Sequence, residues 1–545
     1  MKKTAQAMIV GAAMAAAVLT LPARADQTPL PLVPLPVETH RADGRFIMTD
    51  SAVIVLPPGA GADWRASAEI FAAKVKQRFG VGLALQAGGP DAGCGPDIAL
   101  IGSPAACGLK DGLPEAGVPA AEGYQLAAGP DGVVVQARTA HGFHNALMTL
   151  LQLIDGKASP PAIPAVKVLD YPRFAWRGML IDSARSFQPP DVIKKYVDLL
   201  SELKLDVLHW HLVDDQGWRI ESKVFPRLHE VGGVLAPLSD KKKRALDRDG
   251  WGRDGRGYYT QDEIREIVAY AAERHVMVVP EIDVPGHSSA MLAAYPELSC
   301  SGDPVPIRGM PGIFRTALCP GKEDVYQFLD TLFTELATLF PAPYLHIGSD
   351  EVMASDWLSA PANQELIAKY GYTDNAGLQS YFVGRVNGIL RGKGKTMIAW
   401  DEITAYAPEG AVIQAWRKQD YARVAAEAGR DAVISPVTHC YIDYPNLTFT
   451  LKNLYGFEPL PAGLKPDLAP RILGGEVNLW GERVTLDNMD QKTFPRLIAH
   501  AEVMWSPPGE RDWNDFIARL KPVKKDMKKR GVGFGKTWRD LFMLL

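Results

Sequence analysis

The sequence has little that would suit the chain to nucleic acid, to a membrane or to a metal. Its 59 Lys and Arg residues are nearly balanced by 63 Asp and Glu residues, so no basic surface for nucleic acid or anionic lipid is indicated. No Cys pair has the C-x-x-C spacing of a zinc site, and no G-x-G-x-x-G follows a predicted strand. Beyond the N-terminus no apolar run is long enough to cross a bilayer. We therefore expect no nucleic-acid partner, no metal and no cofactor.

The first 25 residues have the pattern of a secretory signal peptide. Lys2 and Lys3 precede a run of small apolar residues from Ala5 to Leu21, and Ala23-Arg24-Ala25 forms an A-x-A cleavage site. An uncleaved anchor is the alternative, but the run is short for a membrane span and Pro22 ends it. We expect cleavage after residue 25, a periplasmic or secreted protein, and no membrane anchor afterwards. The oligomeric state, monomer or homodimer, stays open.

Only five cysteines are present, and export would allow some of them to form disulfides. Cys94 with Cys107 and Cys300 with Cys319 are the pairs closest in sequence, which leaves Cys440 over. Spacing alone does not fix the connectivity.

Residues 26–168 predict a small α+β domain. Short β-like runs at Ala52–Leu56, Ile98–Ile101 and Gly132–Ala137 alternate with helical patterns at about Trp64–Phe79 and His141–Ile154. The Pro-rich segment 158–164 is a candidate hinge into the next domain.

Residues 169–545 predict a catalytic (β/α)8 TIM barrel with a C-terminal helical tail, because short apolar runs alternate there with amphipathic helices. Pro189-Pro190-Asp191 opens one helix, and Thr260 with Glu263 forms the capping box of another. An open doubly wound sheet is the competing fold. The predicted strands are Gly178–Asp182, Val207–Val213, Val276–Ile282, Tyr344–Ile347, Thr396–Trp400, Val412–Trp416, Ala432–Ser435 and Ile472–Trp480.

Nearly every one of these strands ends in residues that can do polar chemistry or stack on a sugar. The carboxyl ends of parallel barrel strands meet on one face, where active sites are built. A single Asp at a strand end is usually a helix cap, but eight such ends together favour one site. The residues are Arg177 and Asp182 around strand one, then Asp214, Asp215, Trp218, Glu281, Asp283, His287, Asp350, Glu351, Trp400, Asp401, Glu402, Trp416, Tyr441, Asp443, Trp480 and Glu482.

Asp350 and Glu351 are adjacent, which constrains their chemistry. Consecutive strand residues point to opposite faces, so both carboxylates can reach one ligand only where the strand has ended and the chain turns. Adjacent side chains are also poorly placed as the separated acid and nucleophile of ordinary glycosidases. This favours a substrate that supplies its own nucleophile, with one carboxylate acting as the acid.

From about Val33 to Ser506 the chain resembles the family-20 glycoside hydrolases, the β-N-acetylhexosaminidases. The resemblance implies an α+β domain before a (β/α)8 barrel, and retaining, substrate-assisted hydrolysis of terminal β-linked N-acetylhexosamine. The segments that carry it are Val33–Pro36, Thr139–Ile154, Asp170–Gly178, His209–Trp218, Pro280–His287, His346–Glu351, Trp400–Glu402 and Leu479–Glu482.

The matched positions imply roles for individual residues. Glu351 would be the general acid and base, Asp350 would orient the acetamide group, and Tyr441 would hydrogen-bond its carbonyl oxygen. The other implied roles are hydroxyl ligands (Arg177, Asp443 and Glu482), walls around the acetamide and sugar ring (Trp400, Trp416 and Trp480), and supports of the acid (Asp214 and His287). For His211 and Asp283 a structural role is equally compatible with the match.

One position departs from the family pattern, since Ser349 stands where a second glycine is usual. Its Cβ could alter local geometry if the backbone there needs a positive φ. The leading hypothesis is exo-hydrolysis of terminal β-GlcNAc, with β-GalNAc as a second sugar, from chitooligosaccharides or glycoconjugates. The alternatives are a carbohydrate-binding protein on an inactive barrel and a retaining glycosidase with a covalent carboxylate nucleophile.

Overall fold

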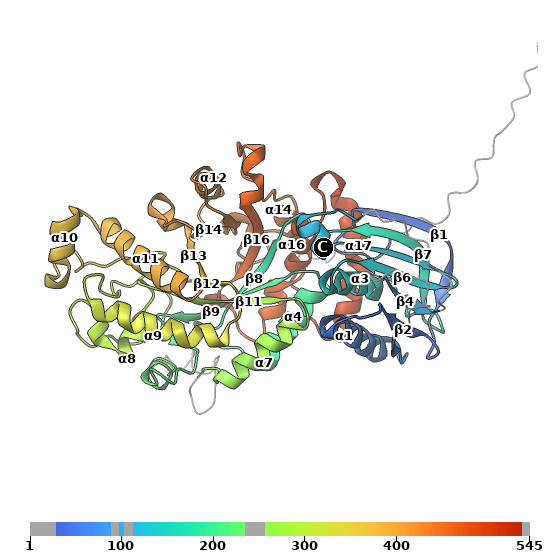
Figure 1. The fold of residues 1–545 in the computed structure, drawn as a ribbon, viewed down its shortest axis with the longest axis horizontal. Helices are drawn as coiled ribbons and strands as arrows, with labels where there is room; N and C mark the ends of the chain where they lie inside the picture. Colours follow the sequence, from blue (N-terminus) through green and yellow to red (C-terminus); the bar gives the residue numbers. More distant parts are fainter. Residues whose placement is uncertain (1–28, 89–97, 103–112, 235–256, 537–545) are drawn as a thin grey trace, which may run out of the picture.

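A computed structural model describes residues 29–88, 98–102, 113–234 and 257–536. The predicted signal peptide and the pair Cys94 and Cys107 lie outside the described residues. The described chain forms an antiparallel-rich sheet followed by a closed parallel barrel with helices around it (Figure 1). The predicted fold class is confirmed.

The barrel closes because its first strand pairs with both the second and the last. All eight predicted strands are present, and no boundary differs by more than two residues. Their interiors are almost wholly buried, so they read in the sequence as continuous apolar runs. In barrel order the strands are β8 (Trp176–Asp182), β9 (Val207–Asp214), β11 (Met277–Ile282), β12 (Tyr344–His346), β13 (Thr396–Trp400), β14 (Val412–Ala415), β15 (Ala432–Ile434) and β16 (Ile472–Leu479). A two-residue strand, β10 (Gly217–Trp218), adds a hairpin to β9.

Helices cover the outside of the barrel, with one departure from the predicted alternation. The strand β13 is followed by a short 3-10 helix, η4 (Asp401–Tyr406), and no α-helix intervenes before β14. The capping box at Thr260 is confirmed, because its hydroxyl accepts from the Glu263 amide and the Glu263 carboxylate accepts from the Thr260 amide. The main covering helices are α4 (Pro190–Glu202), α7 (Gln261–Ala272), α9 (Glu323–Leu339), α11 (Asn375–Gly392), α12 (Asp420–Glu427) and α16 (Arg496–Trp505).

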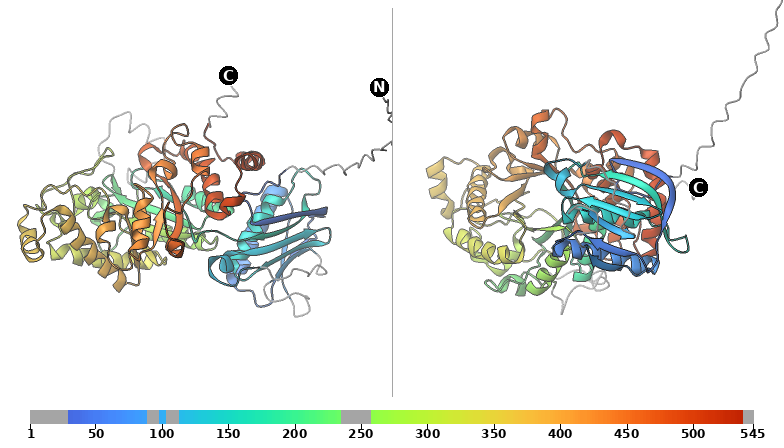
Figure 2. Two further views of the ribbon diagram at one scale, coloured as in Figure 1. Left: turned by 90° about the horizontal axis from the view of Figure 1, so that it is seen from above. Right: turned by 45° about the vertical axis from the view of Figure 1, so that its right-hand side comes forward.

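The N-terminal sheet has seven strands in the order β1-β7-β5-β6-β4-β2-β3. Two helices, α1 (Ala62–Phe79) and α3 (Ala140–Leu153), lie on the face turned toward the barrel (Figures 1 and 2). The hinge prediction at 158–164 is wrong, since Ala162 already begins β7 and that strand continues to Asp170. The other strands are β1 (Glu38–Ile47), β2 (Val53–Leu56), β3 (Ala84–Ala87), β4 (Ile98–Gly102), β5 (Tyr124–Gly129) and β6 (Gly132–Ala137).

The N-terminal sheet and the barrel domain share buried contacts. Trp505, at the end of α16, packs in the core of the N-terminal sheet and donates its indole N–H to Asp170. The ammonium group of Lys204 lies 2.7 Å from the same carboxylate. The predicted C-terminal helix is α17 (Trp513–Lys529), whose Arg519 forms an ion pair with Glu502 of α16. Across the described part of the chain, no helix is both long and apolar enough to span a bilayer.

Candidate active site

The adjacent carboxylates lie in a sharp turn directly after β12. The strand ends at His346, and φ is +61° at Gly348, +68° at Ser349 and +48° at Glu351. These left-handed conformations take Asp350 and Glu351 out of strand alternation. The turn that the adjacent pair requires is therefore present.

Asp283 and Gln379 hold the turn in place. A Cβ at Gly348 would lie 2.1 Å from Oδ1 of Asp283, so only glycine fits there. The Ser349 amide donates to the same oxygen at 3.0 Å. The Gln379 side-chain amide donates to the carbonyl of Ser349 at 2.8 Å and to its hydroxyl at 3.1 Å. The serine at this position thus adopts the positive φ, and its side chain gains a buried hydrogen-bond partner.

The two carboxylates have different surroundings. The side chain of Asp350 is 16% exposed and that of Glu351 is 32% exposed. Burial raises the pKa of Asp350 to about 6; Glu281 and Glu351 add to the increase, and His287 opposes it. The Nε2 atom of His287 lies 3.5 Å from Glu351 and 3.9 Å from Asp350. Glu351 is thus the more accessible carboxylate, and Asp350 lies deeper.

His287 connects Glu351 to a buried pair of carboxylates. Its Nδ1 atom lies 3.1 Å from Asp215 and 3.3 Å from Asp214, so these acids and Glu351 lie on opposite sides of one imidazole ring. Burial would lower the pKa of His287, but the carboxylates outweigh it and raise that pKa well above its usual value. The imidazolium form is therefore favoured. Its Nδ1 is hydrogen-bonded to Asp215, whereas Nε2 has no hydrogen-bond partner in the described structure and lies 3.5 Å from Glu351.

Asp214 is also bound by two other cations. Its Oδ2 atom accepts from His211 at 2.9 Å and lies 2.5 Å from the guanidinium of Arg185. Arg185 contacts Asp182 at 3.2 Å, and its guanidinium carbon lies 5.1 Å from the centre of the Trp480 ring. Arg185 therefore contacts three parts of the site: Asp182 at the end of β8, Asp214 next to His287, and the ring of Trp480.

Four aromatic rings form a wall, and one of them, Tyr441, interacts electrostatically with Asp350. The centroids of Trp400 and Trp480 are 5.8 Å apart, and Tyr441 lies 6.2 Å from Trp416 in a stacked arrangement and 6.1 Å from Trp480. Trp416 donates to Glu402 at 3.1 Å. Burial raises the pKa of Tyr441 well above its usual value, so its hydroxyl stays protonated and can donate.

Two more carboxylates, Asp443 and Glu482, follow β15 and β16, the same strands that precede Tyr441 and Trp480. Asp443 is 1% exposed, and burial raises its pKa to about 6. One of its oxygens contacts Arg483 at 3.1 Å, and the other has no hydrogen-bond partner in the described structure. The side chain of Glu482 is 30% exposed and contributes to the electrostatic surroundings of Arg185. Asp443 and Glu482 can thus accept hydrogen bonds from a polar ligand.

Beneath the site, Glu281 is the centre of a buried network. It accepts from the Trp400 indole at 2.9 Å, and its oxygens lie 2.5 Å from His211, 3.1 Å from His209 and 3.2 Å from His346. Three groups of carboxylate and imidazole atoms lie close enough to share an ion: His209 with Glu281 and His346, Asp214 with Asp215 and His287, and Asp283 with His287 and Asp350. Their members bind one another, and we interpret the groups as the hydrogen-bonded support of the site.

The structure places one predicted site residue elsewhere. Arg177 lies at the start of β8, at the opposite end of the strand from Asp182. Its guanidinium contacts Glu122 at 2.5 Å and Asp206 at 2.9 Å, and it is fully buried between the two domains. A role for Arg177 as a ligand of the sugar is therefore wrong. The remaining predicted residues, from Asp214 to Glu482, lie at the carboxyl ends of the strands.

Sequence reasoning missed Arg185, which occupies the place expected of Arg177. The signal was available, because Arg185 follows the carboxyl end of the first barrel strand whereas Arg177 precedes most of that strand. It also missed Gln379, whose contact with Ser349 joins residues 30 positions apart in the chain.

Comparisons with known proteins identify the family of the chain. The family described as "Glycosyl hydrolase family 20, catalytic domain" matches residues 174–508, and "Glycosyl hydrolase family 20, domain 2" matches residues 30–171. Two curated relatives are named "Beta-hexosaminidase". The protein from Porphyromonas gingivalis is 32% identical over 525 residues, and the match covers 92% of this chain but 64% of that protein, less than two thirds of its length. The protein from Vibrio furnissii is 34% identical over 496 residues, covering 87% of this chain and 76% of its own.

A solved structure is similar over nearly the whole chain. The Vibrio harveyi protein described as a "GH20 Exo beta-N-Acetylglucosaminidase" in complex with N-acetylglucosamine has a TM-score of 0.79 and 29% identity. The match covers 93% of this chain and 79% of that one.

Proposed function

Because the chain belongs to glycosyl hydrolase family 20, we propose that it removes terminal, non-reducing β-linked N-acetylhexosamine from chitooligosaccharides or glycoconjugates, with retention of configuration. The observation that carries the proposal is the turn after β12. There the more exposed Glu351 contacts His287, while the deeper Asp350 lies beside the aromatic wall.

In the first step Glu351 donates its proton to the glycosidic oxygen as the bond from that oxygen to C1 breaks. The carbonyl oxygen of the sugar's own acetamide forms a bond to C1 from the opposite face, which gives a cyclic oxazolinium ion. Asp350 accepts the acetamide N–H and stabilises the positive charge that develops there. Tyr441 stays protonated and donates to the acetamide oxygen, which aims its lone pair at C1.

In the second step Glu351, now ionised, takes a proton from water. The water oxygen attacks C1, and the bond between C1 and the acetamide oxygen breaks. Two displacements at C1 retain its configuration, and no carboxylate of the protein forms a covalent bond. His287 holds the Glu351 carboxyl toward the reacting oxygen in both steps.

The surrounding residues fix one terminal sugar. Trp400, Trp416 and Trp480 enclose the acetamide methyl group and the ring face. Asp443 and Glu482 accept from the sugar hydroxyls, and Arg185 takes the donor role that the resemblance first gave to Arg177. GlcNAc is the leading sugar, and GalNAc is the second candidate.

Release of a chromophore from an aryl N-acetyl-β-glucosaminide tests this function. We expect turnover, much weaker turnover of the matching aryl β-glucoside, and inhibition by an N-acetylated thiazoline that mimics the cyclic intermediate. Equal turnover of both glycosides, or no thiazoline inhibition, would favour a covalent carboxylate nucleophile. No turnover with retained sugar binding would favour the inactive carbohydrate-binding barrel.

We also propose that residues 1–25 are cleaved on export and that the enzyme acts in the periplasm or outside the cell. The support is the sequence pattern of that segment. N-terminal sequencing of the mature protein from fractionated cells should give Asp26 as the first residue. A mature protein that starts at Met1 in the cytoplasmic fraction would contradict the proposal.

A further inference from the structure

The indole of Trp416 is held differently from that of Trp400, its neighbour in the aromatic wall. Trp400 is 1% exposed, and it donates to the buried Glu281 at 2.9 Å. Trp416 directly follows β14 and is only partly buried. Its indole Nε1 atom lies 3.1 and 3.2 Å from the two carboxyl oxygens of Glu402. A side chain from a neighbouring loop therefore supplies the polar contact of this ring.

The register of two barrel strands brings Glu402 to this position. The strands β13 and β14 pair in parallel, and Trp400 lies opposite Gln414. Glu402 and Trp416 each lie two residues beyond that pair, at the carboxyl ends of the strands. The 3-10 helix η4 begins at Asp401, directly after β13, and keeps Glu402 at that end of the barrel.

Asp401 fixes the backbone of the same tryptophan. Its Oδ2 atom accepts from the amides of Trp416 at 3.1 Å and Arg417 at 3.0 Å, and its Oδ1 atom accepts from Nε of Arg417 at 2.5 Å. The side chain of Asp401 is fully buried, whereas that of Glu402 is 17% exposed. Asp401 thus fixes the start of Trp416, and Glu402 fixes the direction of its ring.

Glu402 also lies close to the catalytic turn. Burial raises the pKa of its carboxyl to about 8, and Asp350 and Asp401 add to the increase. The effect of Asp350 means that Glu402 lies on the side of the site that we assign to the acetamide group, where Trp416 stacks on Tyr441. At pH 7 the carboxyl is largely neutral, so glutamine matches it in shape and in charge.

In the proposed function the acetamide methyl group packs against the aromatic wall. A longer acyl group needs more room, and Trp400 offers none because it is buried and held by Glu281. Trp416 is the more exposed ring, and turning it outward breaks its hydrogen bond to Glu402. The strength of that bond therefore adds to the free energy needed to admit a larger acyl group.

We propose that Glu402 is a positioning residue for Trp416, and that its hydrogen bond to the indole restricts the substrate to N-acetyl sugars and makes N-propionyl sugars poor substrates. The inference rests on the proposed function and adds a specificity-determining residue to it. Glu402 acts through the ring, and it contacts neither C1 nor the glycosidic oxygen.

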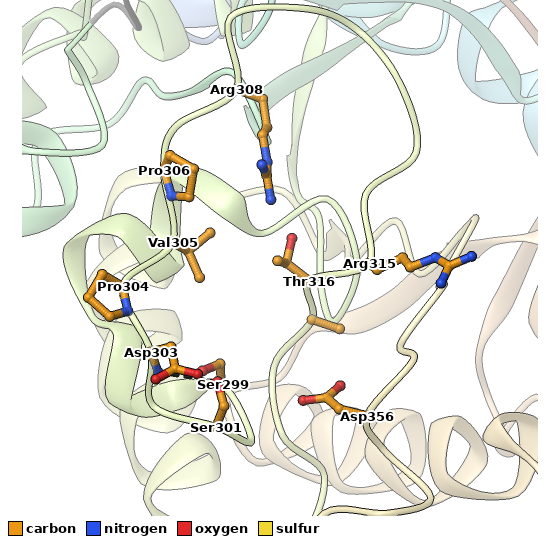
Figure 3. Close-up of a pocket in the computed structure, with 11 residues that line it drawn as sticks. Ser299, Ser301, Asp303, Pro304, Val305, Pro306, Arg308, Arg315, Thr316 and Asp356 are labelled. Carbon is orange, nitrogen blue, oxygen red and sulfur yellow. Dashed lines mark hydrogen bonds between the residues drawn. The ribbon is translucent and has the colours of Figure 1, made fainter.

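The acyl group can be varied without changing the rest of the substrate. The hollow of about 210 Å³ shown in Figure 3 is lined by the loops after β11 and β12, and neither Glu402 nor Trp416 lines it. Two aryl glycosides that differ only in the acyl group present the same groups to that hollow and to Glu351. The ratio of their rates therefore reports on the wall around the acyl group.

The test compares an aryl N-propionyl-β-glucosaminide with the matching N-acetyl compound, through the ratio of kcat/KM for the first to that for the second. Glu402→Met keeps a similar side-chain length but has no oxygen acceptor. We expect it to raise the ratio about fivefold, as for loss of one neutral hydrogen bond. Glu402→Ala takes its place if the methionine variant does not fold.

Two control variants should keep the wild-type ratio. Glu402→Gln retains an oxygen that accepts from the indole, so it rescues the function lost in Glu402→Met. Tyr406→Phe changes another side chain of η4 that interacts with Glu402, and it leaves the partner of Trp416 in place.

A double variant shows whether Glu402 acts through the ring. Trp416→Phe removes the indole N–H, so adding Glu402→Met to it should leave the ratio unchanged. A further fivefold rise in that background would overturn the proposal. So would an unchanged ratio in Glu402→Met, or a rise in Glu402→Gln as large as in Glu402→Met.

An equal loss of kcat/KM with both acyl groups would also overturn the proposal, because it would show that Glu402 only supports the fold. Failure of the proposed function is a separate result, since the wild-type enzyme would then leave the aryl N-acetyl-β-glucosaminide intact.

Discussion

Oε2 of Glu351 lies 3.5 Å from Nε2 of His287, whose other ring nitrogen lies 3.1 Å from Asp215. The imidazole therefore lies between Glu351 and the buried Asp215, which is the position our proposal requires of a group that orients the Glu351 carboxyl. Replacing Glu351 with Gln removes the proton donor, and we expect kcat to fall by about 10²–10⁴ on an alkyl glycoside. The loss should be much smaller with a dinitrophenyl leaving group, which departs without protonation. Rates over a series of leaving groups measure this difference.

His287→Gln should show the same trend with a smaller loss, because the acid is still present but no longer aimed by a cation. Asp443→Asn serves as the comparison, since its proposed role is to bind a sugar hydroxyl and its loss should slow all leaving groups alike. A loss in Glu351→Gln that does not depend on the leaving group would contradict the assignment of Glu351 as the acid.

Asp350 should control the acid limb of the pH profile. It must be ionised to stabilise the charge on the acetamide, and burial raises its pKa to about 6. We expect kcat/KM to fall as the pH drops below about 6. Asp443 also has a pKa of about 6, but a protonated carboxyl can still form a hydrogen bond with a hydroxyl group. The Asp443→Asn variant should therefore still show the fall in kcat/KM at low pH. An activity that stays constant from pH 7 to pH 4.5 would contradict this role.

The raised pKa of Asp350 also predicts that the Asp350→Asn variant is more stable than the wild type at neutral pH. The folded pKa lies above the ordinary 3.8, so the fold favours the protonated form, and this contribution to stability is lost as the pH rises from about 4 to 6. At pH 7.5 the ionised side chain costs about 1–3 kcal/mol. Chemical denaturation should show that Asp350→Asn raises the free energy of unfolding at pH 7.5 and leaves it nearly unchanged at pH 4. Equal effects at the two pH values would refute the linkage.

The barrel was predictable because each of its strands is buried on both faces. A run such as Val207–Asp214 has no exposed residue, so neither amphipathic alternation nor a helical period competes with the strand pattern. In the N-terminal sheet the situation differs. The edge strand β1 is largely exposed and polar, and its pairing with β7 across more than a hundred residues has no local signal. Sequence analysis found β2, β4 and β6 but not β1, β3, β5 or β7.

The candidate site also contains residues that could be predicted from the sequence and contacts that could not. Residues at strand ends, from Asp214 to Glu482, could be predicted because the fold brings those ends together. Contacts between distant side chains could not, and the hydrogen bonds of Gln379 to Ser349 are the clearest case. The motif match indicated Arg177, although this residue lies at the start of β8 and Arg185 follows the carboxyl end of that strand.

The position of Arg177 gives a direct test against Arg185. Arg177→Met leaves Glu122 and Asp206 without their buried partner, and loss of such a partner typically costs about 3–5 kcal/mol. The folded enzyme should nonetheless keep its kcat, because the residue lies at the far end of β8. Arg185→Met should lower kcat/KM by at least about tenfold, since it removes the proposed sugar donor and a partner of Asp214.

If Arg177→Met does not fold, the triple variant that also carries Glu122→Gln and Asp206→Asn removes the two unpaired carboxylate charges. The kcat can then be measured on this folded variant. Thermal unfolding and active-site titration separate the amount of folded enzyme from its turnover. A normal KM in Arg185→Met together with a raised KM in the Arg177 variant would restore the original assignment.

Ser349 supplies a matched pair of variants at the catalytic turn. Its φ of +68° costs a residue with a Cβ about 1–2 kcal/mol, and its hydroxyl offsets part of that through Gln379. Ser349→Gly relieves the strain and loses that bond, so we expect little net change. Ser349→Ala loses the bond and keeps the strain, and should be less stable than Ser349→Gly by about 1–2 kcal/mol. Urea denaturation of the two variants measures the difference. Both variants should retain turnover, because the backbone amide of residue 349 still donates to Asp283. If the alanine variant is as stable as the glycine variant, the positive φ has no energetic cost at this position.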